Sequence, residues 1–131
     1  MTIDALVRVA TYRRVSAPEL EAAGPDVVAE LIEVDGDEVG RIMVAAMPGV
    51  PGGRTVLDIT VLPEHRRQGI GTSALMRWAS LAHEDGGPLT LTVSEGDPAV
   101  GWCRRLGFRS VRAAGSTRVR MVLDAHDEGW R

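Results

Sequence analysis

The sequence contains no lysine and no asparagine, so all 15 of its basic residues are arginines. The absence of lysine excludes catalysis through a lysine Schiff base. It also excludes a P-loop of the usual kind, whose lysine contacts the phosphates of a nucleotide. Cysteine and tyrosine each occur once, as Cys103 and Tyr12. A single cysteine excludes a disulfide within the chain and is typical of a reducing compartment.

Long apolar runs and a strong net charge are also absent. No run approaches the roughly 18 apolar residues that a membrane span requires. The N-terminal residues lack the basic stretch and apolar core of a secretory signal peptide. The formal net charge of −3 gives no electrostatic support for bulk binding of nucleic acid. We therefore expect a cytoplasmic protein that binds neither membranes nor nucleic acid.

The composition that is present fits one globular domain. The chain has 131 residues, of which 44% are hydrophobic and 25% are charged, close to the average for soluble proteins. A chain of this length buries roughly two-thirds of its unfolded surface when it folds. We expect a single domain over residues 1–123, followed by a polar C-terminal tail over residues 124–131.

The hydrophobic pattern predicts a mixed α/β fold. Alternating or β-branched residues predict strands over 5–12, 27–34, 39–46, 55–62, 89–93 and 118–123. Helical spacing predicts one helix over 70–83, another from Pro98 to Leu106, and a short one that begins near Ser16. Hairpins make the first half of the sheet antiparallel, and the crossover through helix 70–83 adds a parallel pair.

Local signals mark where several of these elements begin and end. Asp35 and Gly36 form a typical hairpin turn. Asp97 is a good N-cap for the last helix. Gly107 is expected to end that helix in a left-handed conformation, with Phe108 packing back on it.

The strand over 55–62 alternates strictly in the sequence. Leu57, Ile59 and Val61 are expected on one face, and Asp58 and Thr60 on the other.

A basic turn with two glycines joins this strand to the following helix. Arg66 and Arg67 precede Gly69 and Gly71, and Thr72 follows. The first N–H groups of a helix lack intrahelical partners and carry the positive end of its dipole. Glycines let a phosphate approach such a backbone closely. The turn therefore indicates an anion-binding site, with a plain turn and solvated arginines as the alternative interpretation.

The glycines also match a second known pattern. Residues 69–74 read GIGTSA, which fits the dinucleotide fingerprint G-x-G-x-x-G/A. That fingerprint directly follows the first strand of a parallel set, whereas several residues separate Leu62 from Gly69 and the preceding strands form a meander. A nucleotide-binding domain is therefore the less favoured interpretation.

Two motifs together resemble the GNAT superfamily of N-acetyltransferases. Arg66, Gly69 and Gly71 stand at the spacing of its R-x-x-G-x-G/A pyrophosphate loop. Residues 102–108, WCRRLGF, resemble its second signature, commonly Leu-Tyr-x-x-x-Gly-Phe. The order of strands and helices is similar from about residue 27 to residue 123. The resemblance implies the GNAT fold, a mostly antiparallel α/β sheet in which two parallel strands splay into a V.

The resemblance further implies acetyl-CoA as cosubstrate and no metal. Acetyl-CoA would enter the V between strands 55–62 and 89–93, and a primary amine would attack it directly in a ternary complex. A backbone N–H near Val61 would stabilise the developing oxyanion. The cofactor-binding residues implied in this way are Ile59, Thr60, Val61, Arg66, Arg67, Gln68, Gly69, Ile70, Gly71 and Thr72.

The sequence departs from the family at the residue that usually protonates the leaving thiolate. The tyrosine of the second signature is replaced by Cys103. A cysteine with a pKa near 8.5 could protonate a thiolate of similar basicity, but it could equally be a small buried residue of an apolar helix face. Tyr12 is a further candidate for this acid, although strand packing is its favoured role.

Three residues are candidates for the base that accepts the amine proton. Asp58 ranks first because it lies just upstream of the expected oxyanion site, and Glu95 ranks second because it follows the other arm of the V. Each also has a structural interpretation, as a surface acid and as a support for the next helix. His65 has a suitable pKa but belongs to the phosphate end, so it ranks last.

The sequence gives fewer signals for the acceptor amine than for any other part of the function. The segment 13–26 between the first two strands is short, so the acceptor groove is either open or completed by a second subunit of a homodimer. An open groove suits a peptide amine or a sizeable small molecule, and the negative net charge mildly favours a cationic one. A different class of function is a catalytically weak or inactive acyl-CoA-binding regulatory module of the same fold.

Overall fold

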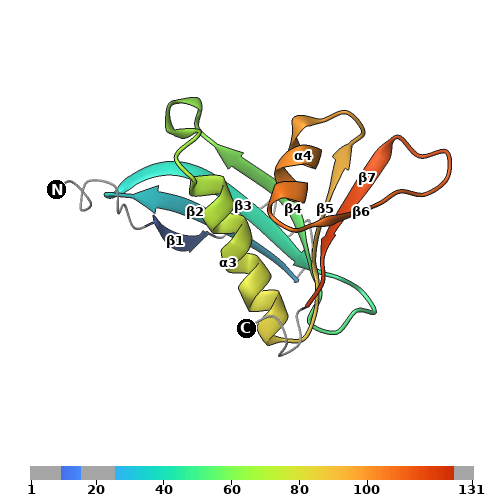
Figure 1. Cartoon of the computed structure of the whole chain (residues 1–131). Helices are drawn as coiled ribbons and strands as arrows, with labels where there is room; N and C mark the ends of the chain where they lie inside the picture. Colours follow the sequence, from blue (N-terminus) through green and yellow to red (C-terminus); the bar gives the residue numbers. More distant parts are fainter. Residues whose placement is uncertain (1–9, 16–25, 126–131) are drawn as a thin grey trace.

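One sheet organises the protein, for which the computed structural model describes residues 10–15 and 26–125 (Figure 1). The strand order in this part of the chain is β1-β2-β3-β4-β5-β7-β6. The strands are β1 (Ala10–Val15), β2 (Val27–Val34), β3 (Asp37–Ala46), β4 (Arg54–Val61), β5 (Leu89–Ser94), β6 (Arg109–Val111) and β7 (Arg118–Leu123). Neighbouring strands are antiparallel except β4 and β5, which are parallel. The mixed, mostly antiparallel sheet predicted from the sequence is thus confirmed.

Some of the predicted elements fall outside the described residues. These are the short helix near Ser16, the first part of the predicted strand 5–12, and most of the polar tail. Within the described range, β1 continues beyond the predicted end to Val15.

The predicted hairpin between β2 and β3 is confirmed in detail. Val34 pairs with Asp37, so the turn contains only two residues. Those residues, Asp35 and Gly36, have φ angles of 53° and 83°. Positive φ at both positions is the type I′ geometry, whose twist matches that of the flanking strands.

The parallel strands β4 and β5 separate soon after they begin. Residues 54–56 of β4 pair with residues 89–91 of β5. Beyond this point β4 continues to Val61 along β3, and β5 continues to Ser94 along β7, without pairing with each other. The sheet therefore opens into the V that the family resemblance implies.

A β-bulge interrupts β4 at the point where the V opens. Met43 of β3 faces Asp58, while Val44 faces Val56, so Leu57 has no cross-strand partner. Leu57 is 52% exposed rather than buried in the core. The predicted strict alternation is wrong here, because one extra residue shifts the two-residue period of the strand.

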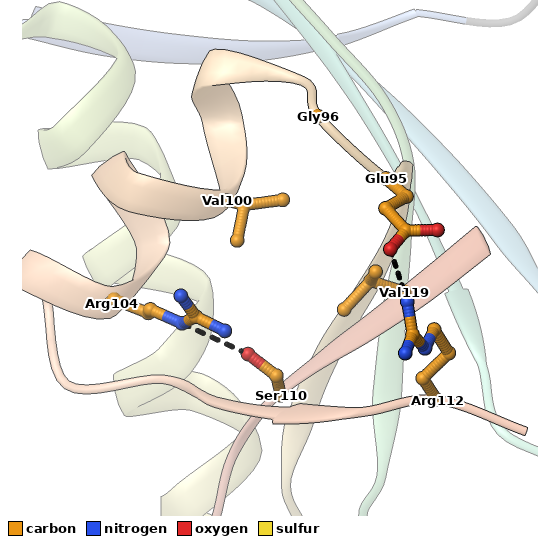
Figure 2. A pocket seen from close by; sticks show the side chains of 7 residues that line it. All are labelled: Glu95, Gly96, Val100, Arg104, Ser110, Arg112 and Val119. Carbon is orange, nitrogen blue, oxygen red and sulfur yellow. Dashed lines mark hydrogen bonds and ion pairs between the residues drawn. The ribbon is translucent and has the colours of Figure 1, made fainter. Parts of the chain in front are cut away.

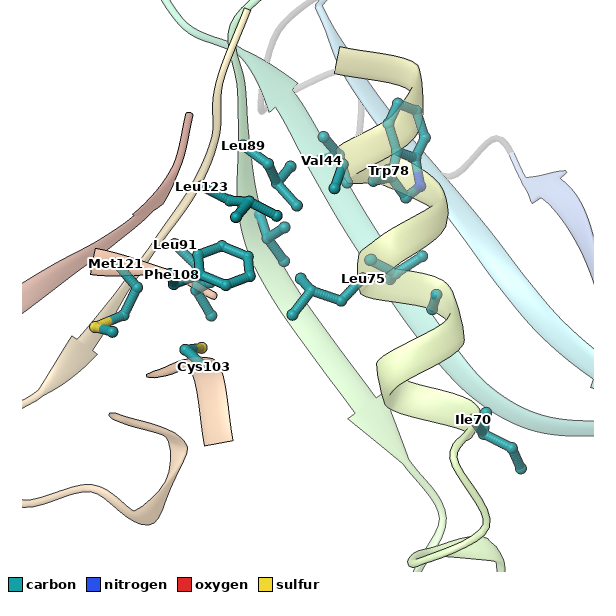
Figure 3. Packing of buried hydrophobic residues seen from close by; sticks show 14 of the residues in the cluster. Val44, Ile70, Leu75, Trp78, Leu89, Leu91, Cys103, Phe108, Met121 and Leu123 are labelled. Atoms are coloured by element: carbon teal, nitrogen blue, oxygen red, sulfur yellow. The ribbon is translucent and has the colours of Figure 1, made fainter. Parts of the chain in front are cut away.

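Two α-helices cover one side of the sheet in the described ranges. They are α3 (Ile70–Glu84), which lies in front of β2 and β3 and contacts β4, and α4 (Pro98–Arg105), which packs near β6 and β7 (Figure 1). Both contribute to a single hydrophobic cluster (Figure 3). The buried residues of α3 are Ile70, Ala74, Leu75, Trp78, Ala79 and Ala82. No helix here is long and apolar enough to cross a membrane.

The caps predicted for α4 are confirmed. The Asp97 carboxylate accepts a hydrogen bond from the N–H of Ala99 at 2.8 Å. At the other end Gly107 has a φ of 102°, and the N–H of Phe108 donates to the carbonyl of Cys103 at 3.0 Å. This is the bonding of a Schellman motif, and the Phe108 ring joins the core as expected.

A buried acid fixes α3 to the sheet. Glu30 of β2 is 1% exposed and accepts hydrogen bonds from Arg77 at 2.6 Å and from the indole of Trp78 at 3.0 Å. The Arg77 guanidinium also lies 4.3 Å from the centre of the Tyr12 ring. These two hydrogen bonds, both to Oε1, offset part of the high cost of burying a carboxylate.

Candidate functional site

A cleft of about 610 Å³ opens beside β4, where the chain turns into α3. One wall comes from β4 and the loop that follows it, and the other from the first turns of α4. The lining residues are Ile59, Val61, His65, Arg66, Arg67, Gly69, Ile70, Gly71, Thr72, Asp97, Pro98, Ala99 and Trp102. The cleft thus brings together eight of the ten residues predicted to bind the cofactor.

The loop before α3 leaves the start of the helix uncapped by any side chain. A 3-10 turn, η1 (Pro63–His65), follows β4, and Arg67 then adopts a positive φ of 64°. Gly69 is the N-cap of α3, with a φ of 79° and no side-chain cap hydrogen bond. Glycine suits this left-handed conformation. The first N–H groups of α3 have no intrahelical partners, so this end of the cleft favours an anion.

The edge of β4 that faces the V presents backbone N–H groups that no neighbouring strand pairs with beyond residue 56. The N–H of Leu62 donates to the carbonyl of Val39 on β3 at 2.9 Å. Because N–H groups alternate between the two edges of a strand, those of Ile59 and Val61 point the other way, towards the gap left by β5. An extended ligand in the V can therefore pair with this edge as a strand would.

Arg66 reaches back to that same edge of β4. Its Nε donates to the carbonyl oxygen of Val61 at 3.0 Å. The guanidinium is exposed and lines the cleft between the edge of β4 and the start of α3. Its charge is therefore available to an anion bound there.

The indole of Trp102 closes the other side of the cleft. Its Nε1 donates to the hydroxyl oxygen of Thr72 at 3.0 Å. Because this hydroxyl accepts from Trp102, its own proton is free to donate elsewhere. The bond joins α4 to the first turn of α3 across the cleft.

Cys103, the neighbour of Trp102, points away from the cleft into the core. Its side chain is fully buried among apolar residues that include Phe108 and Met121 (Figure 3). Burial, and secondarily the nearby Asp97 carboxylate, raise the pKa of the thiol to about 11. The thiol therefore keeps its proton at neutral pH.

Asp58 lies beside the V on the face opposite the cleft. Its carboxylate accepts hydrogen bonds from Arg41 at 3.4 Å and from the Thr60 hydroxyl at 3.3 Å.

Thr60 and Gln68 are the two predicted cofactor-binding residues that do not line the cleft.

Glu95 lines a second pocket of about 400 Å³ rather than the cleft (Figure 2). This pocket lies between α4 and the β6–β7 hairpin, with Val100 and Val119 as its apolar part. Glu95 forms an ion pair with Arg112 at its rim. The structure thus separates the three acid–base candidates from one another: Cys103 lies in the core, Asp58 on the face of the sheet opposite α3 and α4, and Glu95 in the pocket between α4 and the β6–β7 hairpin.

The remaining candidates, His65 and Tyr12, lie on different elements. His65 lines the cleft. Tyr12 packs under Arg77 on β1, three strands away from β4. Its burial raises the pKa of the phenol, with the positive Arg77 opposing this. Among the described residues, no group of three His, Cys, Asp or Glu side chains is placed to hold a metal ion.

Sequence reasoning missed one whole wall of the cleft. Asp97, Pro98, Ala99 and Trp102 all line it. Asp97 and Pro98 were recognisable only as a helix start, and Trp102 only as the first residue of the second signature. No local signal showed that this helix start faces Thr72, thirty residues earlier.

Comparisons with known proteins agree with this geometry. Residues 27–110 match a family model described as an acetyltransferase (GNAT) domain. No protein with a curated description matches the chain. The match to the family model favours a GNAT domain over a nucleotide-binding domain as the interpretation of this chain.

Several solved structures share the fold. One is the ribosomal-protein-S18-alanine N-acetyltransferase from Escherichia coli, with a TM-score of 0.71 and 17% identity over 92% of this chain and 97% of that one. A Bacillus subtilis acetyltransferase in complex with CoA has a TM-score of 0.70 and 10% identity over 90% and 99%. A GNAT family acetyltransferase from Elizabethkingia anophelis with acetyl-CoA bound has a TM-score of 0.68 and 13% identity over 88% and 97%.

Proposed function

The chain belongs to the GNAT acetyltransferase family, and we propose that it transfers the acetyl group of acetyl-CoA to a primary amine by direct attack in a ternary complex. One observation carries this proposal. The uncapped start of α3 and the unpaired edge of β4 meet in a single cleft. An anion site next to a strand edge suits a ligand with a phosphate end and an amide-containing arm.

The residues of the cleft fit acetyl-CoA in a specific order. The N–H groups of Ile70, Gly71 and Thr72, together with Arg66 and Arg67, would hold the pyrophosphate. The edge of β4 would pair with the amides of the pantetheine arm. Fold relatives with CoA and acetyl-CoA bound support this assignment.

The transfer needs little covalent chemistry from the protein. The amine nitrogen bonds to the thioester carbonyl carbon, the C–S bond breaks, the amine gives up a proton, and the CoA sulfur takes one. The N–H of Val61 faces the gap where the carbonyl oxygen would lie, so it would stabilise the developing negative charge. Holding both reactants in the V supplies proximity.

Asp58 is the proposed base. It lies beside the V on the face away from the cofactor cleft, so an amine that arrives from that face meets its carboxylate. Glu95 is the second candidate, but its place in the separate pocket makes it less suited.

The burial of Cys103 favours a packing role over a proton-transfer role. A fully buried thiol with a pKa of about 11 is a weaker acid than the CoA thiol, so it would give up its proton reluctantly. Water that enters the cleft is the simpler proton source for the leaving thiolate.

The proposal is tested by following release of CoA thiol from acetyl-CoA with a panel of primary amines, and by mass spectrometry of the acetylated products. The chain has no lysine, so acetyl-lysine detection reports only the acceptor. We expect acetyl-CoA to be consumed only when an amine is present. Consumption without an amine product would contradict direct transfer.

The alternative, a CoA-binding module without transfer, is favoured by one feature. No tyrosine lines the cleft, and the residue that replaces the usual one is buried. Clear binding of acetyl-CoA with no turnover across the amine panel would select this alternative.

A further inference from the structure

Two exposed arginines stand side by side on the face of the sheet opposite the cofactor cleft. Along β7, Val119 and Met121 are buried on the side of α4, so the alternating residues Arg118 and Arg120 point to the other face, where both are exposed.

These arginines lie beside β5, one of the two strands that border the V. Arg118 pairs across the strands with Ser94, and Arg120 pairs with Thr92. Both β5 residues lie beyond the last point of pairing with β4, so they border the gap directly. Cross-strand neighbours lie about 5 Å apart, and an arginine side chain readily spans that distance. The two guanidinium groups are therefore within reach of a ligand that enters the gap from this face.

Neither guanidinium has a carboxylate partner among the residues that the structure describes, whereas many of the other arginines do. Ion pairs are formed by Arg13, Arg41, Arg54, Arg77, Arg109 and Arg112. The two hydrogen bonds between Arg118 and the Ser116 hydroxyl use the backbone of Arg118 and not its guanidinium. Two unneutralised cations in adjacent positions attract an anion, and arginine binds carboxylates in a bidentate geometry.

A negatively charged side chain on this same face of the sheet, Asp58, lies on β4, the other strand that borders the V. Asp58 of β4 shares the face opposite α3 and α4 with Arg41 and Thr60. A ligand at the gap therefore meets a carboxylate on one side and two guanidinium groups on the other. This local arrangement differs from the expectation of a cationic acceptor, which rested on net charge alone.

We propose that the acceptor is an amine that also carries a carboxylate, which Arg118 and Arg120 bind while the amino group lies at the gap near Asp58. This inference rests on the proposed function, because the acetyl-CoA in the cleft reaches the gap from the helix-covered face and leaves the opposite face to the acceptor. The two arginines would then determine acceptor specificity without taking part in proton transfer.

The test compares amines with and without the carboxylate. The probes are free amino acids, each against its primary amide, and short peptides, each against its C-terminal amide. We expect carboxylate forms to be preferred at least about tenfold in kcat/KM. Whichever of the two series shows the preference identifies whether the carboxylate belongs to an amino acid or to a peptide.

Variants of Arg118 and Arg120 test whether these two residues cause the preference for acceptors with a carboxylate. In Arg118→Gln/Arg120→Gln we expect KM for the carboxylate acceptor to rise about tenfold, with kcat and the KM for acetyl-CoA unchanged. Arg120→Glu should shift the preference towards diamines. Arg14→Gln, which removes an exposed arginine at the far edge of the sheet, is the matched control and should change neither value.

The possible failures are distinguishable. Equal turnover of acids and amides, or a preference that survives in the double variant, overturns the acceptor inference alone. No turnover of any amine, despite binding of acetyl-CoA, overturns the proposed transfer activity together with it.

Discussion

The indole N–H of Trp102 donates to the hydroxyl of Thr72 at 3.0 Å, so a single hydrogen bond joins the two helices across the cleft. Trp102 belongs to α4, and Thr72 to the first turn of α3, where the proposed anion site lies. The bond therefore orients a hydroxyl whose free proton can donate to a bound phosphate. Helix α4 thus contributes to the proposed cofactor site although none of its residues belongs to the glycine loop.

We predict that Trp102→Phe weakens the binding of acetyl-CoA several-fold, because a hydrogen bond of this kind contributes about 1 kcal/mol. Isothermal titration with acetyl-CoA measures the effect. Thr72→Val should weaken binding similarly, and the double variant should be little worse than either one, since both changes remove the same interaction. Fully additive losses would contradict this coupling.

We predict that Cys103→Ala lowers stability but leaves kcat within about twofold once the folded fraction is accounted for, because the thiol packs in the core. Chemical denaturation and initial-rate kinetics separate the two effects. Cys103→Ser is the informative second variant, since it keeps a proton donor. A loss of kcat in the alanine variant that serine restores would establish Cys103 as the acid.

The buried thiol also predicts how stability changes at alkaline pH. The pKa of Cys103 is about 11 in the folded chain, above the ordinary value of 9.0 that the unfolded chain approaches. The unfolded state therefore loses the proton first, so the free energy of unfolding falls as pH rises from 9 to 11. Titration of this group contributes at most about 1.4 kcal/mol per pH unit.

Urea denaturation of the wild type and of Cys103→Ala at pH 8 to 11 isolates this contribution, because Tyr12 titrates in both proteins. The difference in unfolding free energy between them should shrink as pH rises. A difference that stays constant across this range would contradict the burial of the thiol.

We predict that Asp58→Asn lowers kcat/KM at least about tenfold and removes the acidic limb of its pH profile, with the affinity for acetyl-CoA unchanged. The reason is that the Asp58 side chain lies at the gap but outside the cofactor cleft. Glu95→Gln serves as the matched control and should have the smaller effect. An unaltered acidic limb in Asp58→Asn would exclude this residue as the base.

The sequence patterns located the regular elements well because their signals are local. Strand β2 and the start of α3 fall where alternation and helical spacing place them, and the caps at Asp97 and Gly107 have the expected bonds. The strand β6 was not predicted, because its three residues are all exposed and show no alternation.

Other features depend on contacts between distant parts of the chain. The bulge at Leu57 arises from the pairing of β4 with β3, which no period within β4 reveals. The opening of the V was implied by resemblance to a family and not by periodicity. The wall that Trp102 gives the cleft, and the separation of Glu95 from it, follow from the position of α4.

The central claim, that the cleft between β4 and the two helices binds acetyl-CoA, is most directly tested by a thermal shift comparison of two ligands and two proteins. At a concentration of about 100 times Kd, acetyl-CoA should stabilise the wild type by about 2.7 kcal/mol, or roughly 10 °C in Tm, while NAD should not.

The second protein is Gly71→Leu. A Cβ at Gly71 would lie 3.7 Å from Val61 and 3.8 Å from Trp102, so the backbone tolerates a side chain whose outer atoms fill the cleft. The account predicts a large shift with acetyl-CoA in the wild type and none in this variant. An equal shift in both proteins, or a shift with NAD instead, would contradict it.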